Sequence, residues 1–125
     1  QISSSIEIST KSNFIYIFNT SKLWMTSSGA AREMTNNPGY YKNLVAFSKN
    51  LPTPHGYQIE LDLKRTFPEE PRCMTDSFVN SLRNILIAYS VRNSSIGYCQ
   101  GMNFIAGKLL LVLEDEVDNL CNINI

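Results

Sequence analysis

The stretch that decides the fold is TDSFVNSLRNILIAYSVRN, residues 75–93. Its large apolar side chains recur three and four residues apart, which places them on one face of an α-helix. These side chains are Phe78, Leu82, Ile85, Leu86 and Tyr89. Thr75 is a good N-cap residue, and Asp76 stands where a negative charge favours a helix N-terminus. The pattern predicts a helix that begins at Thr75–Asp76, is buried along one face and ends near Asn93.

A second helix is predicted from Gly101 or Met102 to about Glu114, and its surface is apolar on most sides. A helix of this kind is normally buried on most sides. Only residues 115–125 follow it in the sequence. Either the other helices wrap it fully, or its partner surface lies in sequence outside this chain. The second alternative would make the chain a piece of a larger helical domain.

Two shorter helices are predicted upstream. Residues 21–27 precede Gly29, which is a typical helix-ending residue. Residues 36–39, NNPG, form a turn, and apolar side chains at near-helical spacing then follow as far as Asn50. The first of these helices contains Trp24, which we expect to anchor the core.

The segment Gln58–Arg65 has two interpretations. Ile59 and Leu63 alternate with charged residues, which favours a strand. Asp62 and Arg65 are one helical turn apart, which fits a short helix. With the other segments, the expected fold class is all-α, with about five short helices. The predicted core consists of Phe18, Trp24, Tyr41, Leu44, Phe78, Leu82, Ile85, Leu86, Tyr89, Phe104, Ile105, Leu109 and Val112.

Length and composition exclude several classes of protein. The chain has 125 residues, which corresponds to one domain or a large piece of one, and its formal net charge is zero. Nucleic-acid binders usually carry a basic excess, so we expect no nucleic-acid partner. We expect no transmembrane segment, because the longest apolar stretch spans about ten residues where about 20 are needed. Residues 1–13 are interpreted as a polar leader and residues 14–125 as the domain.

The sequence predicts no metal site. Its three cysteines, Cys73, Cys99 and Cys121, are far apart, and His55 is the sole histidine. A structural zinc site needs four ligands that usually come in close pairs. Reduced thiols in a cytosolic protein are the expected state of the cysteines.

Two segments carry residues suited to chemistry. In IELDLKRTFP, residues 59–68, an acid precedes Arg65 by three residues. A carboxylate can orient a guanidinium through bidentate hydrogen bonds, and an oriented arginine can neutralise a transferring phosphoryl group. In GYCQGMN, residues 97–103, Gln100 precedes a glycine at a helix start, and its amide can orient an attacking water. The plainer alternatives are a structural Asp62–Arg65 ion pair and a glutamine that satisfies helix-end backbone groups.

Together these segments resemble the paired signature of TBC domains, the GTPase-activating modules for Rab GTPases. The first is Ile59-x-x-Asp62-x-x-Arg65 within Gln58–Pro68, and the second is Tyr98-x-Gln100 within Ile96–Asn103. Upstream, residues 23–30 and 37–41 resemble the family's first motif and the helix after it. The order and spacing fit from about residue 14 to residue 116. One departure is Thr20, where the family usually has an arginine four residues before the tryptophan.

The resemblance implies a mechanism with two fingers supplied in trans. Arg65 would enter the partner's nucleotide site and stabilise charge on the γ-phosphoryl group. Gln100 would orient the attacking water in place of the GTPase's own glutamine. By the same resemblance, Asp62 would support Arg65, Ile59 would pack the segment down and Tyr98 would help shape the contact surface. Thr66 and Gly101 are the remaining predicted supporting or GTPase-binding residues.

The resemblance also implies the partners and the setting. The partner would be a Rab-family small GTPase that carries GTP and Mg²⁺, so the chain would need no cofactor or metal of its own. The expected location is cytoplasmic, peripheral to endomembranes through the GTPase. Family domains are about twice as long as the matched segment, so residues 14–125 would be the N-terminal half and would lack the C-terminal half. The alternatives are a GTPase-binding scaffold module that is catalytically weak or silent, and a plain helical structural domain.

Overall fold

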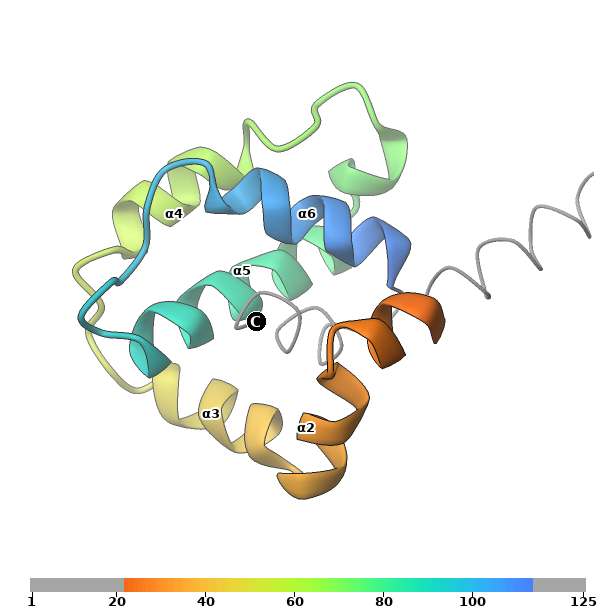
Figure 1. Cartoon of the computed structure of the whole chain (residues 1–125). Helices are drawn as coiled ribbons and strands as arrows, with labels where there is room; N and C mark the ends of the chain where they lie inside the picture. Colours follow the sequence, from red (N-terminus) through yellow and green to blue (C-terminus); the bar gives the residue numbers. More distant parts are fainter. Residues whose placement is uncertain (1–21, 114–125) are drawn as a thin grey trace, which may run out of the picture.

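The computed structural model describes residues 22–113, which form helices joined by loops, with no strand among them (Figure 1). Helix α5, Asp76–Arg92, lies in the middle of the fold. It packs against α3 (Tyr40–Ser48), α4 (Gly56–Leu63) and α6 (Met102–Val112). The Thr75 side chain caps α5 by accepting a hydrogen bond from the Phe78 N–H at 3.2 Å. The all-α prediction is therefore confirmed, as are the predicted bounds of α5.

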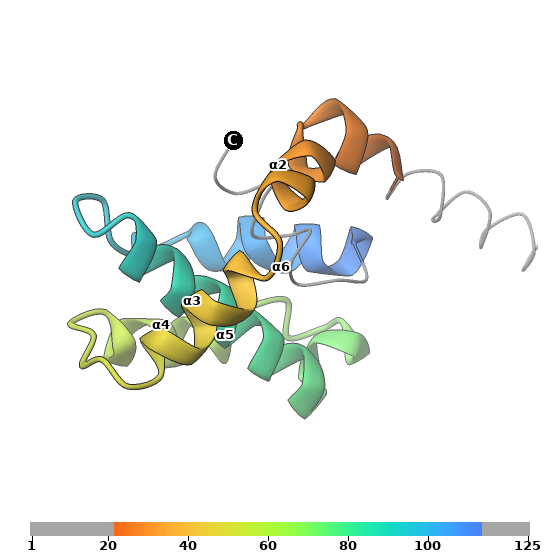
Figure 2. The ribbon, with the colours of Figure 1, turned by 90° about the horizontal axis from the view of Figure 1, so that it is seen from below.

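The other described elements are short. Residues 22–27 are helical and end before Gly29, as the sequence predicts. Helix α2, Ala30–Asn36, follows, and Figure 2 shows it at the end of α3, on the side of the molecule away from α4. A 3-10 helix, Pro71–Met74, precedes α5. Neither α2 nor the 3-10 helix was predicted, because neither segment has enough apolar residues to show a period.

The ambiguous segment before Arg65 is a helix, α4, and not a strand. Ile59 and Leu63 are four residues apart and are 0% and 5% exposed. A strand would have placed Leu61 with them on one face, but in the helix Leu61 is only partly buried. Burial of the i, i+4 pair against α5 therefore decides the element.

The buried core joins four segments of the chain. Its members share contacts around α5 and come mainly from α3, α4, α5 and α6. They are Tyr41, Ile59, Leu63, Leu82, Ile85, Leu86, Ala88, Tyr98 and Ala106. Leu44, Phe78 and Tyr89 of the predicted core pack against this cluster as partly buried side chains. Phe18 and the predicted leader at residues 1–13 lie outside the described residues.

The prediction that they lie in the core is wrong for three residues. Trp24 is 47% exposed, Phe104 46% and Ile105 61%. Trp24 lies on the short helical stretch before α2, at the edge of the described part. On α6 the buried residues are Asn103, Ala106 and Gly107. The most deeply buried face of the helix thus consists of small and polar residues. Met102 and Leu110 pack against the core as partly buried side chains, and Phe104 and Ile105 point outward.

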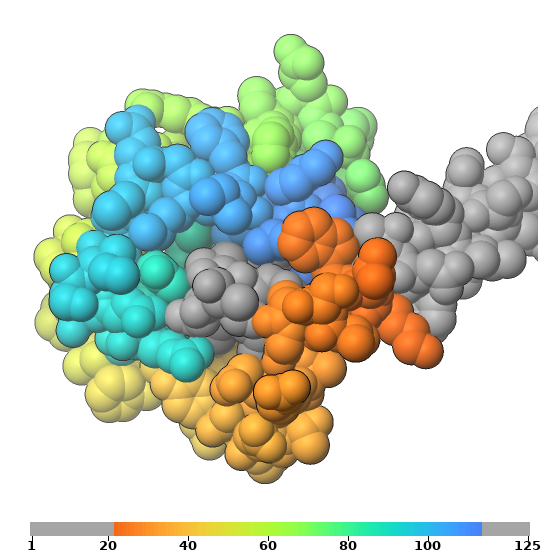
Figure 3. Space-filling view, viewed as in Figure 1, coloured from red at the N-terminus to blue at the C-terminus, as the bar shows by residue number. Residues whose placement is uncertain are grey.

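Among the described residues, α6 is therefore not wrapped on all sides. Figure 3 shows its side chains across one face of the molecule, beside those of the connection between α4 and α5. This outcome contradicts full wrapping by the other described helices. In the described part of the chain, no helix is both long enough and apolar enough to span a bilayer.

Candidate functional site

The C-terminal end of α4 presents Arg65 to solvent. The Asp62 carbonyl accepts hydrogen bonds from the Arg65 N–H at 3.0 Å and from the Thr66 hydroxyl at 2.8 Å. These bonds close a tight turn directly after the helix. Thr66 is buried, whereas the Arg65 side chain is 61% exposed. The turn therefore holds its backbone down and leaves the guanidinium free to reach a partner.

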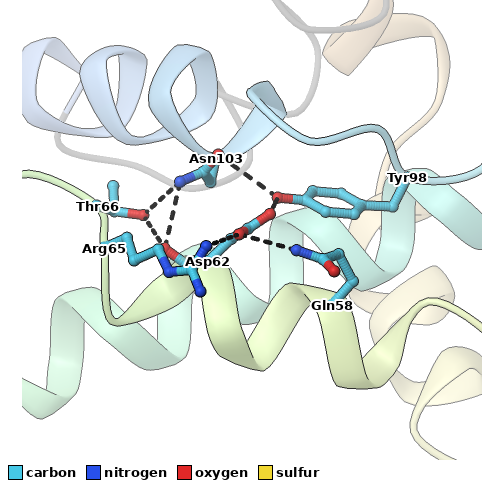
Figure 4. Close-up of polar contacts among 6 residues, drawn as sticks. All are labelled: Gln58, Asp62, Arg65, Thr66, Tyr98 and Asn103. Atoms are coloured by element: carbon cyan, nitrogen blue, oxygen red, sulfur yellow. Dashed lines mark hydrogen bonds and ion pairs between the residues drawn. The ribbon is translucent and has the colours of Figure 1, made fainter.

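The Asp62 carboxylate lies between Arg65 and Tyr98 and is 2% exposed (Figure 4). Oδ2 accepts a hydrogen bond from the Tyr98 hydroxyl at 2.6 Å, and Oδ1 accepts one from the Gln58 amide at 3.0 Å. The Arg65 guanidinium is 4.0 Å from Oδ1. The expected bidentate pair is therefore not formed, and the carboxylate oxygens instead accept hydrogen bonds from Tyr98 and Gln58. Asp62 supports Arg65 through the turn and through a longer-range attraction.

Asn103 joins α6 to this turn. Its side-chain amide donates to the Asp62 carbonyl at 3.2 Å and to the Thr66 hydroxyl at 2.9 Å. Its Oδ1 lies 3.5 Å from the Tyr98 hydroxyl, and the residue is 1% exposed. The side chain thus links the turn after α4 with the loop before α6.

Gln58 and Asn103 had no predicted role. Gln58 could have been found from its position four residues before Asp62, which is one turn away on a helix. Asn103 could have been found as a polar side chain at the start of an otherwise apolar helix. A buried polar group needs hydrogen-bond partners, so such a residue points to a buried network.

Tyr98 is 7% exposed and lies under the surface. It was expected to help shape a contact surface, but its ring and hydroxyl face inward to the core and to Asp62. Burial, and then the hydrogen bond to Asp62, raise the pKa of Tyr98 above its ordinary value. The phenol therefore stays protonated at neutral pH and remains a donor to the carboxylate.

Replacing Tyr98 with phenylalanine is expected to destabilise the chain by about 1–3 kcal/mol, because it leaves a buried carboxylate oxygen without its donor. The measurement is the free energy of unfolding in urea. Tyr57→Phe is the matched control, since Tyr57 is 79% exposed and should be unaffected. Equal unfolding midpoints for the two variants would show that the 2.6 Å hydrogen bond contributes nothing to stability.

Gln100 lies in the second loop, between Tyr98 and the start of α6, and is exposed. The loop needs two glycines in the left-handed region: Gly97 has φ +64° and Gly101 has φ +103°. A Cβ on Gly97 would lie 2.3 Å from Nε2 of His55, so the loop also passes close to the start of α4. Gly101 is the N-cap of α6, and the space beside it is open.

The structure therefore separates the predicted site residues into two groups. Arg65 and Gln100 are exposed on two loops. Asp62, Thr66 and Tyr98 are buried in one hydrogen-bonded network, and Ile59 lies in the core below it. A guanidinium offers a fixed fork of donors and an amide can donate and accept. The exposed Arg65 can therefore bind an anionic group and the exposed Gln100 can orient a water, while the buried network supports the turn that carries Arg65. The described residues contain no group of His, Cys, Asp and Glu side chains that could hold a metal ion.

The described part of the chain is thus an all-helical frame that exposes an arginine and a glutamine on two loops. A sequence model described as the Rab-GTPase-TBC domain matches residues 20–123. The chain therefore belongs to the RabGAP-TBC family. The family assignment made from the motifs is confirmed.

Comparison with individual relatives supports this family assignment. The chain is 44% identical over 101 residues to growth hormone-regulated TBC protein 1-A of Danio rerio, covering 75% of the chain and 27% of the relative. It is 43% identical over 101 residues to growth hormone-regulated TBC protein 1 of Homo sapiens, covering 78% and 30%. It is 51% identical over 81 residues to TBC1 domain family member 2A of Mus musculus, covering 63% and 9%. The chain thus spans less than a third of each relative.

A solved structure has the same fold. The crystal structure of the Chlamydomonas flagellar RabGAP TBC domain superposes with a TM-score of 0.78 at 28% sequence identity. The match covers 86% of this chain and 37% of that one. The similarity therefore includes most of this chain and a minority of the solved domain.

Proposed function

We propose that this chain belongs to an activator of a Rab-family GTPase, with Arg65 and Gln100 as its two fingers. One observation carries the proposal. The two motif side chains that would have to enter a partner's site are exposed, while the motif residues beside them in the sequence, Asp62 and Tyr98, are buried. A simple surface ion pair between Asp62 and Arg65 would not require the Asp62 carboxylate to be buried and to accept hydrogen bonds from two other side chains.

In the proposed reaction the water oxygen forms a bond to the γ-phosphorus of GTP, and the bond to the β,γ-bridging oxygen breaks. Negative charge then grows on the bridging and γ-phosphoryl oxygens. The Arg65 guanidinium would donate hydrogen bonds to these oxygens, and the Gln100 amide would orient the water. An arginine finger is worth about 10³–10⁵ in the rate of hydrolysis.

The GTPase would supply the nucleotide and its Mg²⁺, and we propose no cofactor bound by this chain. We propose a cytoplasmic location, peripheral to endomembranes through the GTPase. Since the chain covers 27% and 30% of its first two relatives, we propose that full activity also involves sequence outside residues 1–125.

The test is single-turnover GTP hydrolysis by a panel of Rab GTPases, with this chain and with a chain extended past Ile125. We expect at least one GTPase to be accelerated. Acceleration should persist when the GTPase's own water-orienting glutamine is replaced by alanine, because Gln100 takes its place. With that altered GTPase, Gln100→Ala should abolish acceleration.

The outcomes separate the alternatives. Acceleration by the extended chain alone would assign docking or stability to the additional sequence. Binding without acceleration by either chain would overturn the proposal in favour of a GTPase-binding scaffold. Acceleration that is insensitive to Gln100→Ala would remove the glutamine from the mechanism.

A further inference from the structure

Helix α6 holds the turn that carries Arg65 at two positions one helical turn apart. The first is Asn103 and the second is Gly107, and both are buried. Residues four apart lie on the same face of a helix. This face of α6 therefore contacts the turn twice, and each contact has a different chemistry.

The Asn103 contact is polar. The amide nitrogen donates both to the Asp62 carbonyl, at the start of the turn, and to the Thr66 hydroxyl, at its end. Arg65 lies between these two points in the sequence. One side chain thus spans the turn. Without it, the Asp62 carbonyl would accept hydrogen bonds only from the Arg65 N–H and the Thr66 hydroxyl, both within the turn.

The Gly107 contact is steric. A Cβ at this position would lie 2.9 Å from Cγ2 of Thr66 and 3.3 Å from Cε2 of Phe67. The absence of a side chain is what lets the turn lie directly on the helix. Phe67 has φ +46°, a conformation that a bulky residue rarely adopts without support, and its ring lies 5.8 Å from that of Phe104.

The same helix also carries the second loop. Gln100 directly precedes Gly101, the N-cap of α6, and is three residues from Asn103. A helix is a stiff element, so a contact made at Asn103 fixes the turn relative to the loop that begins the helix. The spacing between the Arg65 turn and Gln100 then depends on α6, and not on α4 alone.

We propose that Asn103 and Gly107 are positioning residues that set the Arg65 turn against Gln100 for catalysis. This inference rests on the proposed function. Neither residue would touch the GTPase-bound nucleotide, because both are buried. Their role would be to keep the two fingers at the separation that one transition state requires, where a misplacement of about 1 Å can cost about 10²-fold in rate.

The test uses Asn103→Ala and Gly107→Ala in the extended chain, with Asn43→Ala on the exposed side of α3 as the matched control. Single-turnover hydrolysis is measured against activator concentration. We expect both variants to lower the saturating rate constant about 10- to 100-fold. The concentration that gives half the maximal rate should change less than about 3-fold, and the control should match the unaltered chain.

Limited trypsin digestion supplies a second readout that needs no GTPase. A loosened turn should be cut faster after Lys64 and Arg65 in both variants, while cutting after Lys42 on α3 stays unchanged. This pattern would show that the two residues hold the turn, whether or not a GTPase is accelerated. Failure of the unaltered chain to accelerate any GTPase would count against the proposed function, and against a catalytic role for the contact with it. Unchanged cutting at the turn, or a change only in the half-maximal concentration, would overturn the inference. If Asn103→Ala does not fold, Gly107→Ala decides.

Discussion

Arg65→Ala is expected to lower the accelerated rate of GTP hydrolysis by about 10³-fold or more, while GTPase affinity changes little. The side chain is 61% exposed, and its ion-pair partner among the described residues, Asp62 Oδ1, is 4.0 Å away. Removing it therefore leaves the hydrogen bonds of Tyr98 and Gln58 to Asp62 in place. The loss should appear in the saturating rate constant and not in folding.

The measurement is single-turnover hydrolysis with the partner found in the panel, together with binding of the GTPase in its GTP form. Arg65→Lys keeps the charge but loses the planar fork, so we expect it to recover only part of the rate. Arg32→Ala, an exposed arginine on α2, is the matched control. An Arg65→Ala variant that retained full acceleration would remove the arginine finger from the mechanism.

The fold was predictable where one physical signal dominated. The i, i+3, i+4 pattern and the Thr75 cap defined α5, because a single buried face was enough to show the period. Helix α6 was predicted, but its buried face was not. Its apolar residues surround the helix, so no period shows which side packs, and the close contact at Asn103 and Gly107 decided the orientation.

The candidate site was predictable in its exposed parts. The spacing of Asp62 and Arg65 and the glycines beside Gln100 pointed to two loops at helix ends. The bidentate Asp62–Arg65 pair is not formed. Its absence could not be predicted, because spacing along one helix cannot show that Tyr98, 36 residues away, donates to the same carboxylate. Contacts between distant segments depend on how the helices pack, and the sequence pattern of one segment does not contain that information.

Ile59→Ala is expected to destabilise the chain by about 2–5 kcal/mol, the second large effect. Ile59 is 0% exposed and lies in the core between α4 and α5. Truncation removes three methyl or methylene groups from a packed site and leaves a cavity that the helices fill only in part. Ile59→Val should cost about 0.5–1.5 kcal/mol, because one methylene is lost. The measurement is urea unfolding, with Tyr57→Ala on the exposed side of α4 as the matched control.

The two large effects should separate in the same assay. Ile59 lies below the network that carries Arg65, so its truncation should reduce the fraction of folded chain while leaving both fingers chemically intact. At a temperature where Ile59→Ala is folded, its saturating rate constant should approach that of the unaltered chain, whereas Arg65→Ala should stay inactive at every temperature. A folded Ile59→Ala variant with a rate as low as that of Arg65→Ala would instead mean that the core contact sets the position of the finger. Catalysis would then be sensitive to packing on both sides of the turn, from α5 below and from α6 beside it.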